Sequence, residues 1–197
     1  MTVRVGLTGS IGMGKSTTAK LFSDEGCAVW DADAAVHRLY SQGGAAVDPM
    51  RDAFPNAVID GRVDRSVLKQ IIAEDSTALP RIEAIVHPLV ARDRQAFLDS
   101  AQSDIVVFDI PLLFEGSGAA MMDAVVVVSA PADIQRARVM DRGTMTVDQF
   151  EHILSKQMPD AEKRARADFV VETTTIDAAR TQVRAILDQI RKQKPDA

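Results

Sequence analysis

Residues 9–16 of the chain read G-S-I-G-M-G-K-S and fit the pattern G-x-x-x-x-G-K-[ST] of a phosphate-binding loop. Glycines at the fixed positions let the backbone turn tightly and bring its N–H groups against phosphate oxygens. In this pattern Lys15 supplies a cation to the β- and γ-phosphates of a nucleoside triphosphate, and the Ser16 hydroxyl ligates Mg²⁺. The spacing therefore predicts a nucleotide site rather than a glycine-rich turn without a ligand.

The elements on either side of the loop are those that the pattern requires. Residues 3–7 form a short apolar run typical of a buried strand, and residues 15–25 carry helix formers up to Gly26. A helix that opens at Lys15 adds unpaired N–H groups and the positive end of its dipole to the phosphate site. We expect the phosphates to contact Gly9, Ser10, Ile11, Gly12, Met13, Gly14, Lys15 and Ser16.

Two carboxylates, Asp31 and Asp33, stand at the end of a second predicted strand over residues 27–30. Ligands of open α/β sheets bind beyond the carboxyl ends of the strands. The pair could hold Mg²⁺ or accept a proton from a substrate hydroxyl. The alternative is that Asp33 only caps a helix over residues 34–40. Because a cap needs one aspartate and not two, we favour the functional interpretation.

A third carboxylate, Asp109, ends the apolar run of residues 104–109. This pattern is typical of a central parallel strand with a Walker B-like aspartate at its tip, which would hold Mg²⁺ through water. An ordinary strand-end turn at the following Ile-Pro pair is the alternative. Residues 124–129, with four consecutive valines, predict the next strand, buried on both faces.

The segment from residue 34 to residue 103 shows no obvious buried strand and is predicted to be mostly helical. Helical spacing of apolar residues is clear over residues 65–73. A proline after His87 should interrupt the next helix, because the residue before a proline is pushed out of the α region. His87 either satisfies the exposed backbone there or contacts a substrate, and the residues alone favour the structural role. So long a helical segment exceeds a simple crossover, so we predict an inserted substrate-binding subdomain.

A second helical region follows the valine-rich strand and carries several arginines. Arg138 and Arg142 are four residues apart and share one helix face, and Thr146 with Gln149 predicts a capping box for the next helix. Acidic residues nearly balance the basic ones, so exposed helices held by ion pairs are one interpretation. The other is a lid that closes over the phosphates and brings arginines to the transferring group.

The C-terminal part of the chain predicts a last short strand over residues 169–171 and a closing helix. The helix carries one apolar stripe that would pack on the sheet, formed by Ile176, Ala179, Val183, Ile186, Leu187 and Ile190.

Composition sets broad limits on partners and location. The chain has 197 residues, 46% of them hydrophobic, and a formal net charge of −5, which argues against a general nucleic-acid surface. The single Cys27 excludes an intramolecular disulfide and fits a reducing compartment. No apolar run approaches the roughly 20 residues that span a bilayer, and the N-terminus lacks the features of a signal peptide. We expect a cytoplasmic monomer without nucleic-acid or membrane partners.

The phosphate-binding loop alone does not distinguish a kinase, a GTPase switch and a motor-type ATPase. A GTPase should carry N-K-x-D to read guanine, but the only asparagine is Asn56, in an unrelated context. Helicase-type and AAA-type ATPases usually have an acidic residue after the Walker B aspartate, whereas Asp109 precedes an isoleucine and a proline. A helical insertion and an arginine-bearing lid favour a small-molecule kinase.

At this level of detail the chain resembles the dephospho-CoA kinase family essentially from end to end. The shared motifs are L-T-G-x-I-G-x-G-K-S-T at residues 7–17, D-A-D at 31–33, the pair His87-Pro88, D-I-P-L-L-F-E at 109–115, Arg138 with Arg142, Gln157 and Ala167-Asp168. This combination is far more specific than the phosphate-binding loop by itself.

The resemblance implies an α/β P-loop kinase with a parallel sheet flanked by helices, which phosphorylates the ribose 3′-hydroxyl of dephospho-CoA with ATP and Mg²⁺. It implies a nucleotide-binding core, a helical CoA-binding domain and a helical lid in one P-loop kinase unit. The corresponding ranges are 1–33, 104–131 and 167–197 for the core, 34–103 for the substrate domain and 132–166 for the lid.

Site roles follow from the same resemblance, residue by residue. ATP would be bound by residues 12–17, which extends the loop to Thr17, and Asp33 becomes the candidate base. The remaining catalytic groups would be Lys15, Arg138 and Arg142, and the metal ligands Ser16 and Asp109. The substrate contacts would be Asp31, Asp33, His87, Leu112 and Glu115, so the resemblance moves His87 to the substrate side.

The chain departs from the family pattern at two places. Met13 replaces the small serine usual between the last two loop glycines, and we expect its backbone N–H to serve a phosphate all the same. Glu172 and the three threonines after it stand where the family commonly has an asparagine and a glycine near the adenine, which leaves the adenine contacts open. A kinase of another alcohol or nucleoside, or a nucleotide-binding regulator without phosphoryl transfer, remains the alternative function.

Overall fold

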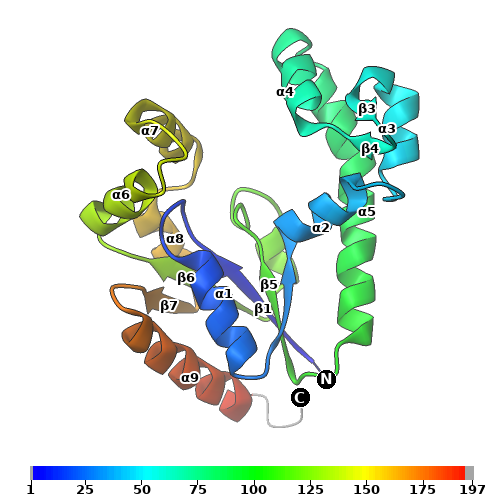
Figure 1. Ribbon diagram of the computed structural model, residues 1–197. Coiled ribbons are helices and arrows are strands. Elements are labelled where there is room, and N and C mark those ends of the chain that lie inside the picture. The colour runs from blue at the N-terminus through cyan, green and yellow to red at the C-terminus, as the bar shows by residue number, and fades with distance from the viewer. Residues whose placement is uncertain (1, 194–197) are drawn as a thin grey trace. The chain divides into compact units, whose positions relative to one another are not determined.

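The structure is a computed structural model that describes residues 2–193 and divides into two compact units (Figure 1). The first unit, here the sheet unit, holds the described residues up to Trp30 and from Ala101 onward. The second, here the helical unit, is Asp31–Ser100. Each unit has its own apolar core, so each can be described by itself.

The sheet unit is built on a five-stranded sheet in the order β2-β5-β1-β6-β7. The ladders between β1 and β5, β1 and β6, and β6 and β7 are all parallel, as the apolar, doubly buried strands predicted. The strands are β1 Val3–Thr8, β2 Ala28–Asp31, β5 Ile105–Asp109, β6 Ala124–Ser129 and β7 Phe169–Glu172.

The sheet unit also contains five α-helices within the described residues, of which α1 and α9 contribute to the core of the sheet. They are α1 Lys15–Asp24, α6 Ala132–Asp141, α7 Val147–Lys156, α8 Asp160–Arg166 and α9 Ile176–Gln193, with a short 3₁₀ turn, η2 Gly118–Met121. The predicted stripe of α9 is buried against the strands except at one position. Ile176 is 60% exposed, so its inclusion in the stripe was wrong, because it lies in the first turn beyond the reach of the core.

The strand order places the phosphate-binding loop at a switch in topology. From β1 the chain crosses through α1 to β2, on the β5 side of the sheet, and later passes from β5 to β6 on the opposite side of β1. In open α/β sheets such a switch creates the crevice, at the carboxyl ends of the strands, in which ligands bind. The loop after β1 is therefore positioned by the fold as well as by its own sequence.

The helical unit packs its helices around a second core. Its elements are α2 Ala32–Tyr40, α3 Val47–Ala53, the 3₁₀ turn η1 Pro55–Ala57, β3 Val58–Ile59, β4 Arg62–Val63, α4 Arg65–Glu74 and α5 Ala78–Ser100. The core contains Leu39, Met50 and Phe54 from α2, α3 and the residue after α3, together with Leu68 and Ile82 from α4 and α5.

The predicted helix break at His87-Pro88 was wrong. A single helix, α5, runs through both residues and keeps Pro88 in its interior. A proline inside a helix costs about 3 kcal/mol through the lost hydrogen bond and the ring clash. Apolar side chains before and after the proline, among them Ile82, Val86 and Leu89, all pack into the same core, and this shared burial opposes the break.

The expectation of a mostly helical insertion is confirmed, and the insertion also contains a small antiparallel hairpin of β3 and β4. Its turn is Asp60-Gly61, with positive φ angles of 50° and 71° at the two residues. Asp-Gly is a strong sequence signal for the turn that requires both residues to have positive φ. The turn itself was predictable, but strands of two residues are too short to show an alternating pattern.

None of the helices within residues 2–193 combines the length and the apolar character needed to cross a membrane.

Candidate active site

The phosphate-binding loop joins β1 to α1, and glycines shape it where side chains would not fit. Gly12 and Gly14 have φ angles of 79° and 89°, a region that residues with a Cβ rarely adopt. A Cβ on Gly12 would lie 2.6 Å from the Val139 Cγ2 atom and 2.9 Å from the Gln135 carbonyl oxygen. The loop therefore follows a tight path that ends at the first turn of α1.

Two glutamines outside the loop hold its backbone at Ile11. The Ile11 N–H donates to the Gln157 Oε1 atom at 3.2 Å, and the Gln135 side-chain amide donates to the Ile11 carbonyl at 2.7 Å. Gln135 lies on α6 and Gln157 ends α7. The helices after β6 thus contact the loop directly. Sequence reasoning noted Gln157 only as part of the family pattern and passed over Gln135.

Met13 is a structural anchor of the loop. Its side chain is 3% exposed, and its sulfur accepts a weak hydrogen bond from the Ala130 N–H at 3.0 Å. Its carbonyl accepts a hydrogen bond from the Thr173 hydroxyl at 2.7 Å. Its N–H donates to the Ser10 carbonyl at 3.1 Å, so this group closes a turn in the loop instead of standing open for a phosphate as we expected.

The predicted cation and carboxylate of the nucleotide site lie together. The Lys15 ammonium forms an ion pair with Asp109, which is 2% exposed at the tip of β5. Ser16, next to Lys15 in the first turn of α1, is exposed. No cluster of three or more acidic, histidine or cysteine side chains suited to a metal occurs within residues 2–193. Any Mg²⁺ here would therefore need phosphate oxygens and water among its ligands.

Thr173 connects the arginine-bearing helix to the phosphate-binding loop. The Arg138 guanidinium donates to the Thr173 hydroxyl at 2.9 Å and also to the Thr173 carbonyl. The same hydroxyl donates to the Met13 carbonyl, so α6, the segment after β7 and the loop form one hydrogen-bonded relay. The departure from the family pattern in this segment thus places a buried threonine in the framework of the site.

A cavity of about 480 Å³ lies beside this relay and the first turns of α1. Arg138 and Arg142, which sequence spacing placed on one helix face, both line it, although Arg142 is at the C-terminal end of α6 and is exposed. The remaining lining residues come from the end of α6, from α1 and the glycine before it, and from the segment that opens α9: Asp141, Gly14, Thr17, Thr18, Thr173, Thr174, Thr175, Ile176 and Ala179.

The helix α8 is fixed to the sheet unit by two buried contacts. Lys163 is fully buried, and its ammonium lies 3.0 Å from the Glu115 Oε1 atom. One turn earlier, the Asp160 carboxylate accepts a hydrogen bond from the Ser129 hydroxyl at 2.8 Å, at the end of β6. Lys163 belongs to the second helical region, in which basic and acidic residues nearly balance, and no local pattern distinguishes it from its exposed neighbours.

Glu115 is engaged by the protein itself. The Met158 N–H donates to its Oε1 atom at 2.9 Å, beside the ion pair with Lys163. Burial alone would raise the pKa of the Glu115 carboxyl, but the Met158 N–H and the Lys163 ammonium outweigh it and hold this pKa below its ordinary value. Leu112, the other predicted substrate contact in this loop, is 52% exposed.

In the helical unit, the two aspartates at the start of α2 take different roles. The Asp31 carboxylate accepts a hydrogen bond from the Ala34 N–H at 2.9 Å and caps the helix, which begins at Ala32. The alternative that Asp33 is the cap was therefore wrong. Asp33 lies in the first turn, exposed, and makes no hydrogen bond or ion pair within the described helical unit. His87 is exposed on α5.

Comparison with known proteins gives one consistent family. A family model described as dephospho-CoA kinase matches residues 3–178. A protein of Ruegeria pomeroyi with the same name is 70% identical over 191 residues, which is 97% of each chain. A Thermus thermophilus crystal structure is 33% identical, has a TM-score of 0.86 and aligns over 96% of this chain and 98% of its own.

The fold is shared more widely than the sequence. A dephospho-CoA kinase structure from Campylobacter jejuni, 23% identical, has a TM-score of 0.71 and covers 98% of this chain and 100% of its own. At this identity the likeness concerns the fold alone, and it agrees with the P-loop kinase architecture expected from the sequence.

Proposed function

Because the chain belongs to the dephospho-CoA kinase family, we propose that it transfers the γ-phosphoryl group of ATP to the ribose 3′-hydroxyl of dephospho-CoA. The products are coenzyme A and ADP, and the reaction is the last step of coenzyme A synthesis. The observation that carries this proposal is the 70% identity, over 97% of both chains, to a relative named dephospho-CoA kinase.

In this proposal the sheet unit binds ATP. The loop from Gly9 to Thr17 holds the phosphates, with Lys15 directed to the β- and γ-phosphates. The cavity of about 480 Å³ beside Thr173 accepts the adenosine end. Support for the phosphate site comes from the N-terminal turn of α1, where unpaired N–H groups and the helix dipole favour an anion.

Mg²⁺ fits the oxygen donors at this site. The exposed Ser16 hydroxyl and the Asp109 carboxylate are hard ligands of the kind that Mg²⁺ prefers, and Asp109 would act through water. When bound, the ion would neutralise negative charge on the β- and γ-phosphates. Lys15 pairs with Asp109 in the structure. With ATP bound, Lys15 would pair with the phosphates instead of Asp109.

Asp33 serves as the general base in the proposed reaction. Its exposed carboxylate is not used as the helix cap, so it can accept the proton of the ribose 3′-hydroxyl. The 3′-oxygen forms a bond to the γ-phosphorus, the bond from that phosphorus to the β–γ bridging oxygen breaks, and ADP leaves. The proton remains on Asp33 until solvent removes it.

Two arginines stabilise the negative charge of the phosphoryl group during its transfer. Arg142 is exposed at the end of α6 and carries the charge that approaches the γ-phosphoryl group. Arg138, which lines the same nucleotide cavity, is held by its hydrogen bond to Thr173. Residues 132–166 form the lid in this proposal, although α8 is held to the sheet unit by Lys163 and Asp160, so closure would involve chiefly α6 and α7.

The remaining assignments belong to the same proposal. The core spans residues 1–33, 104–131 and 167–197, and residues 34–103 bind the acceptor, with contacts from Asp31, Asp33, His87, Leu112 and Glu115. We place the enzyme in the cytoplasm as a monomer without nucleic-acid or membrane partners. A single, buried cysteine supports a reducing compartment.

The test is ADP release from ATP and Mg²⁺ with dephospho-CoA, adenosine or shikimate as the acceptor. ADP that appears only with dephospho-CoA, in an amount equal to the coenzyme A formed, is the expected result. Turnover with shikimate or adenosine instead would favour a kinase of another alcohol. Slow hydrolysis that no acceptor changes would favour a nucleotide-binding regulator.

A further inference from the structure

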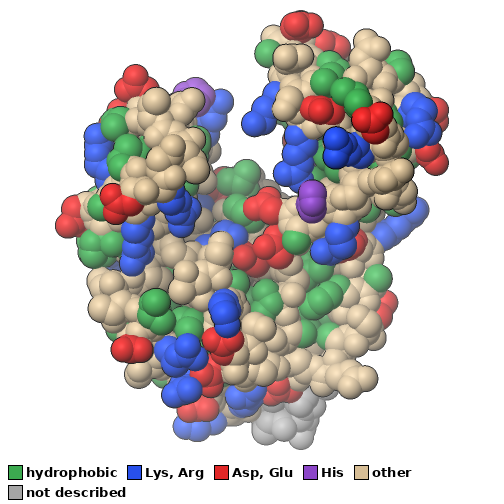
Figure 2. All heavy atoms as spheres, in the orientation of Figure 1, with side chains coloured by type: hydrophobic (Ala, Val, Ile, Leu, Met, Phe, Trp, Pro, Cys, Tyr) green, Lys and Arg blue, Asp and Glu red, His purple; other side chains and the backbone are tan. Residues whose placement is uncertain are grey.

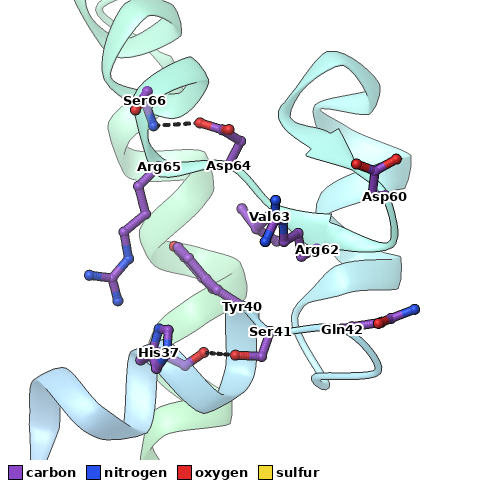
Figure 3. Close-up of a pocket in the computed structure, with 10 residues that line it drawn as sticks. All are labelled: His37, Tyr40, Ser41, Gln42, Asp60, Arg62, Val63, Asp64, Arg65 and Ser66. Carbon is purple, nitrogen blue, oxygen red and sulfur yellow. Dashed lines mark hydrogen bonds between the residues drawn. The ribbon is translucent and has the colours of Figure 1, made fainter.

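The helical unit contains a cavity of about 730 Å³ that the sequence did not reveal (Figure 3). Its walls come from three segments: the end of α2 with the turn after it, the β3–β4 hairpin, and the start of α4. All ten lining residues belong to the helical unit, so its shape does not depend on the sheet unit.

The cavity contains two arginines that form no ion pair within the described helical unit. Arg62 and Arg65 both line it, both are exposed, and neither forms an ion pair with a carboxylate within the described helical unit. In contrast, Arg38 and Arg51 of the same unit pair with aspartates at 2.7 Å and 2.5 Å. The two cavity arginines are therefore available to an anionic ligand.

Two carboxylates, Asp60 and Asp64, line the cavity together with the two arginines. The Asp64 carboxylate accepts hydrogen bonds from the Ser66 and Val67 N–H groups, at 2.8 Å and 3.1 Å, and caps α4. Its negative charge is thus directed at the helix terminus. Asp60 stands on the hairpin turn and is the other carboxylate of the lining.

An aromatic wall holds one of the arginines in place. The Arg65 guanidinium carbon lies 5.7 Å from the centre of the Tyr40 ring, a cation–π distance. Figure 3 shows the Arg65 side chain extending from the start of α4 past Tyr40 toward the side on which His37 is drawn. A guanidinium that rests on an aromatic face keeps its N–H groups available for phosphate oxygens.

The helix α2 carries both the proposed base, Asp33, and part of the cavity wall. Asp33 and His37 are four residues apart, share one exposed face of α2, and are separated by about 6 Å along the helix axis. An acceptor whose 3′-hydroxyl lies at Asp33 can therefore extend its 5′ substituent toward His37 and the cavity. In dephospho-CoA that substituent is a diphosphate ester.

We propose that this cavity binds the diphosphate of the acceptor, with Arg62 and Arg65 as its cations. Arginine binds phosphate oxygens through paired N–H donors, which gives orientation as well as affinity. The apolar faces of Tyr40 and Val63 then adjoin the first part of the pantetheine chain. The inference rests on the proposed function, because the diphosphate belongs to the proposed substrate.

The test compares Arg65→Ala, Arg62→Ala and the double variant with the wild-type enzyme. The KM for dephospho-CoA should rise about tenfold or more for each single variant, since a charged hydrogen-bond partner is lost, while kcat and the KM for ATP change little. Arg65→Lys should recover part of the loss. Arg51→Ala is the matched control, because Arg51 is an exposed arginine of the same unit that already has a carboxylate partner.

The outcomes separate this inference from the proposed function. A KM for dephospho-CoA that stays within twofold in the double variant would overturn the cavity assignment, with the reaction intact. An equal rise in the KM for ATP would also overturn it, because the effect would then be structural. A wild-type enzyme that fails to phosphorylate dephospho-CoA would remove the proposed function itself.

Discussion

The sheet unit and the helical unit differ in how they hold the charged side chains near their cavities. In the sheet unit, Lys15 and Lys163 pair with Asp109 and Glu115, and Arg138, which lines the nucleotide cavity, donates to Thr173. Arg142 lines the same cavity and is exposed. Around the helical cavity, Arg62 and Arg65 are exposed and form no ion pair with a carboxylate among residues 2–193. The space-filling view shows Lys and Arg side chains on both units (Figure 2).

The difference indicates that the two halves of the proposed reaction have different requirements. Phosphoryl transfer depends on groups held in position before the substrate arrives, which the buried network of the sheet unit provides. Acceptor binding depends on recognition of a flexible molecule, for which exposed arginines without a carboxylate partner in the described helical unit are available. Substitutions in the sheet unit should therefore affect stability and kcat, and those in the helical unit should affect KM.

Asp33→Asn should produce the largest effect. It is an exception to the comparison, because Asp33 lies on the helical unit but is proposed to take part in the chemical step. Loss of the base should lower kcat by about 10²- to 10⁴-fold, while ATP binding persists. Steady-state kinetics with dephospho-CoA, together with ATP titration, measure both quantities. Asp31→Asn is the informative comparison, since asparagine caps a helix as well as aspartate does. Near-normal turnover in Asp33→Asn would exclude the base role.

Arg142→Ala should lower kcat/KM by about 10²- to 10³-fold, because an exposed cation that meets the transferring group acts mainly in the transition state. Arg136→Ala is the control, since Arg136 lies on the same helix and pairs with Glu151 on the surface at 3.3 Å. Identical kinetics for the two variants would show that Arg142 is an ordinary surface charge without a role in the transition state.

Lys163→Met tests whether the sheet unit depends on its buried ion pair. Removal of the ammonium leaves Glu115 partly buried without its cation, so the free energy of unfolding should fall by about 3–5 kcal/mol. Urea unfolding measures this change. The double variant Lys163→Met/Glu115→Gln should recover part of the loss. If the single variant is as stable as the wild type, the pair does not hold α8 in place.

Thr173→Val removes the hydroxyl that connects Arg138 to the Met13 carbonyl, with little change in volume. The unpaired groups left behind should cost about 1–3 kcal/mol and should raise the KM for ATP more than the KM for dephospho-CoA. Thr181→Val, at an exposed threonine of α9, is the control. Equal effects of the two substitutions would show that the relay does not support the nucleotide cavity.

The smallest expected effect is on the pH dependence of the free energy of unfolding. The pKa of Glu115 is lowered in the folded protein, so its carboxylate contributes stability above the pKa of the unfolded chain. This contribution is lost as the pH falls through the folded pKa. The urea midpoint from about pH 6 to about pH 3 should therefore fall more steeply for the wild type than for Glu115→Gln. Parallel curves would contradict the assignment.

Much of the site was predictable because its signals lie close together in the chain. The loop glycines, Lys15 and Ser16 form one continuous motif, and Asp109 follows directly from the apolar strand that it ends. The capping box of Thr146 and Gln149 was also predicted from spacing and is present, with both reciprocal hydrogen bonds. In each case, neighbouring residues specify the local backbone, and the backbone positions the functional group.

The sequence alone determined the family, the phosphate-binding loop, the central strands and the pair of carboxylates at α2. Tertiary structure alone decided which carboxylate caps α2, that α5 continues through Pro88, and that Lys163 is buried against Glu115. It also brought Thr173 to Met13, 160 positions away in the chain. Local patterns record the preferences of neighbouring residues, whereas burial and distant hydrogen bonds depend on which segments the completed fold packs together.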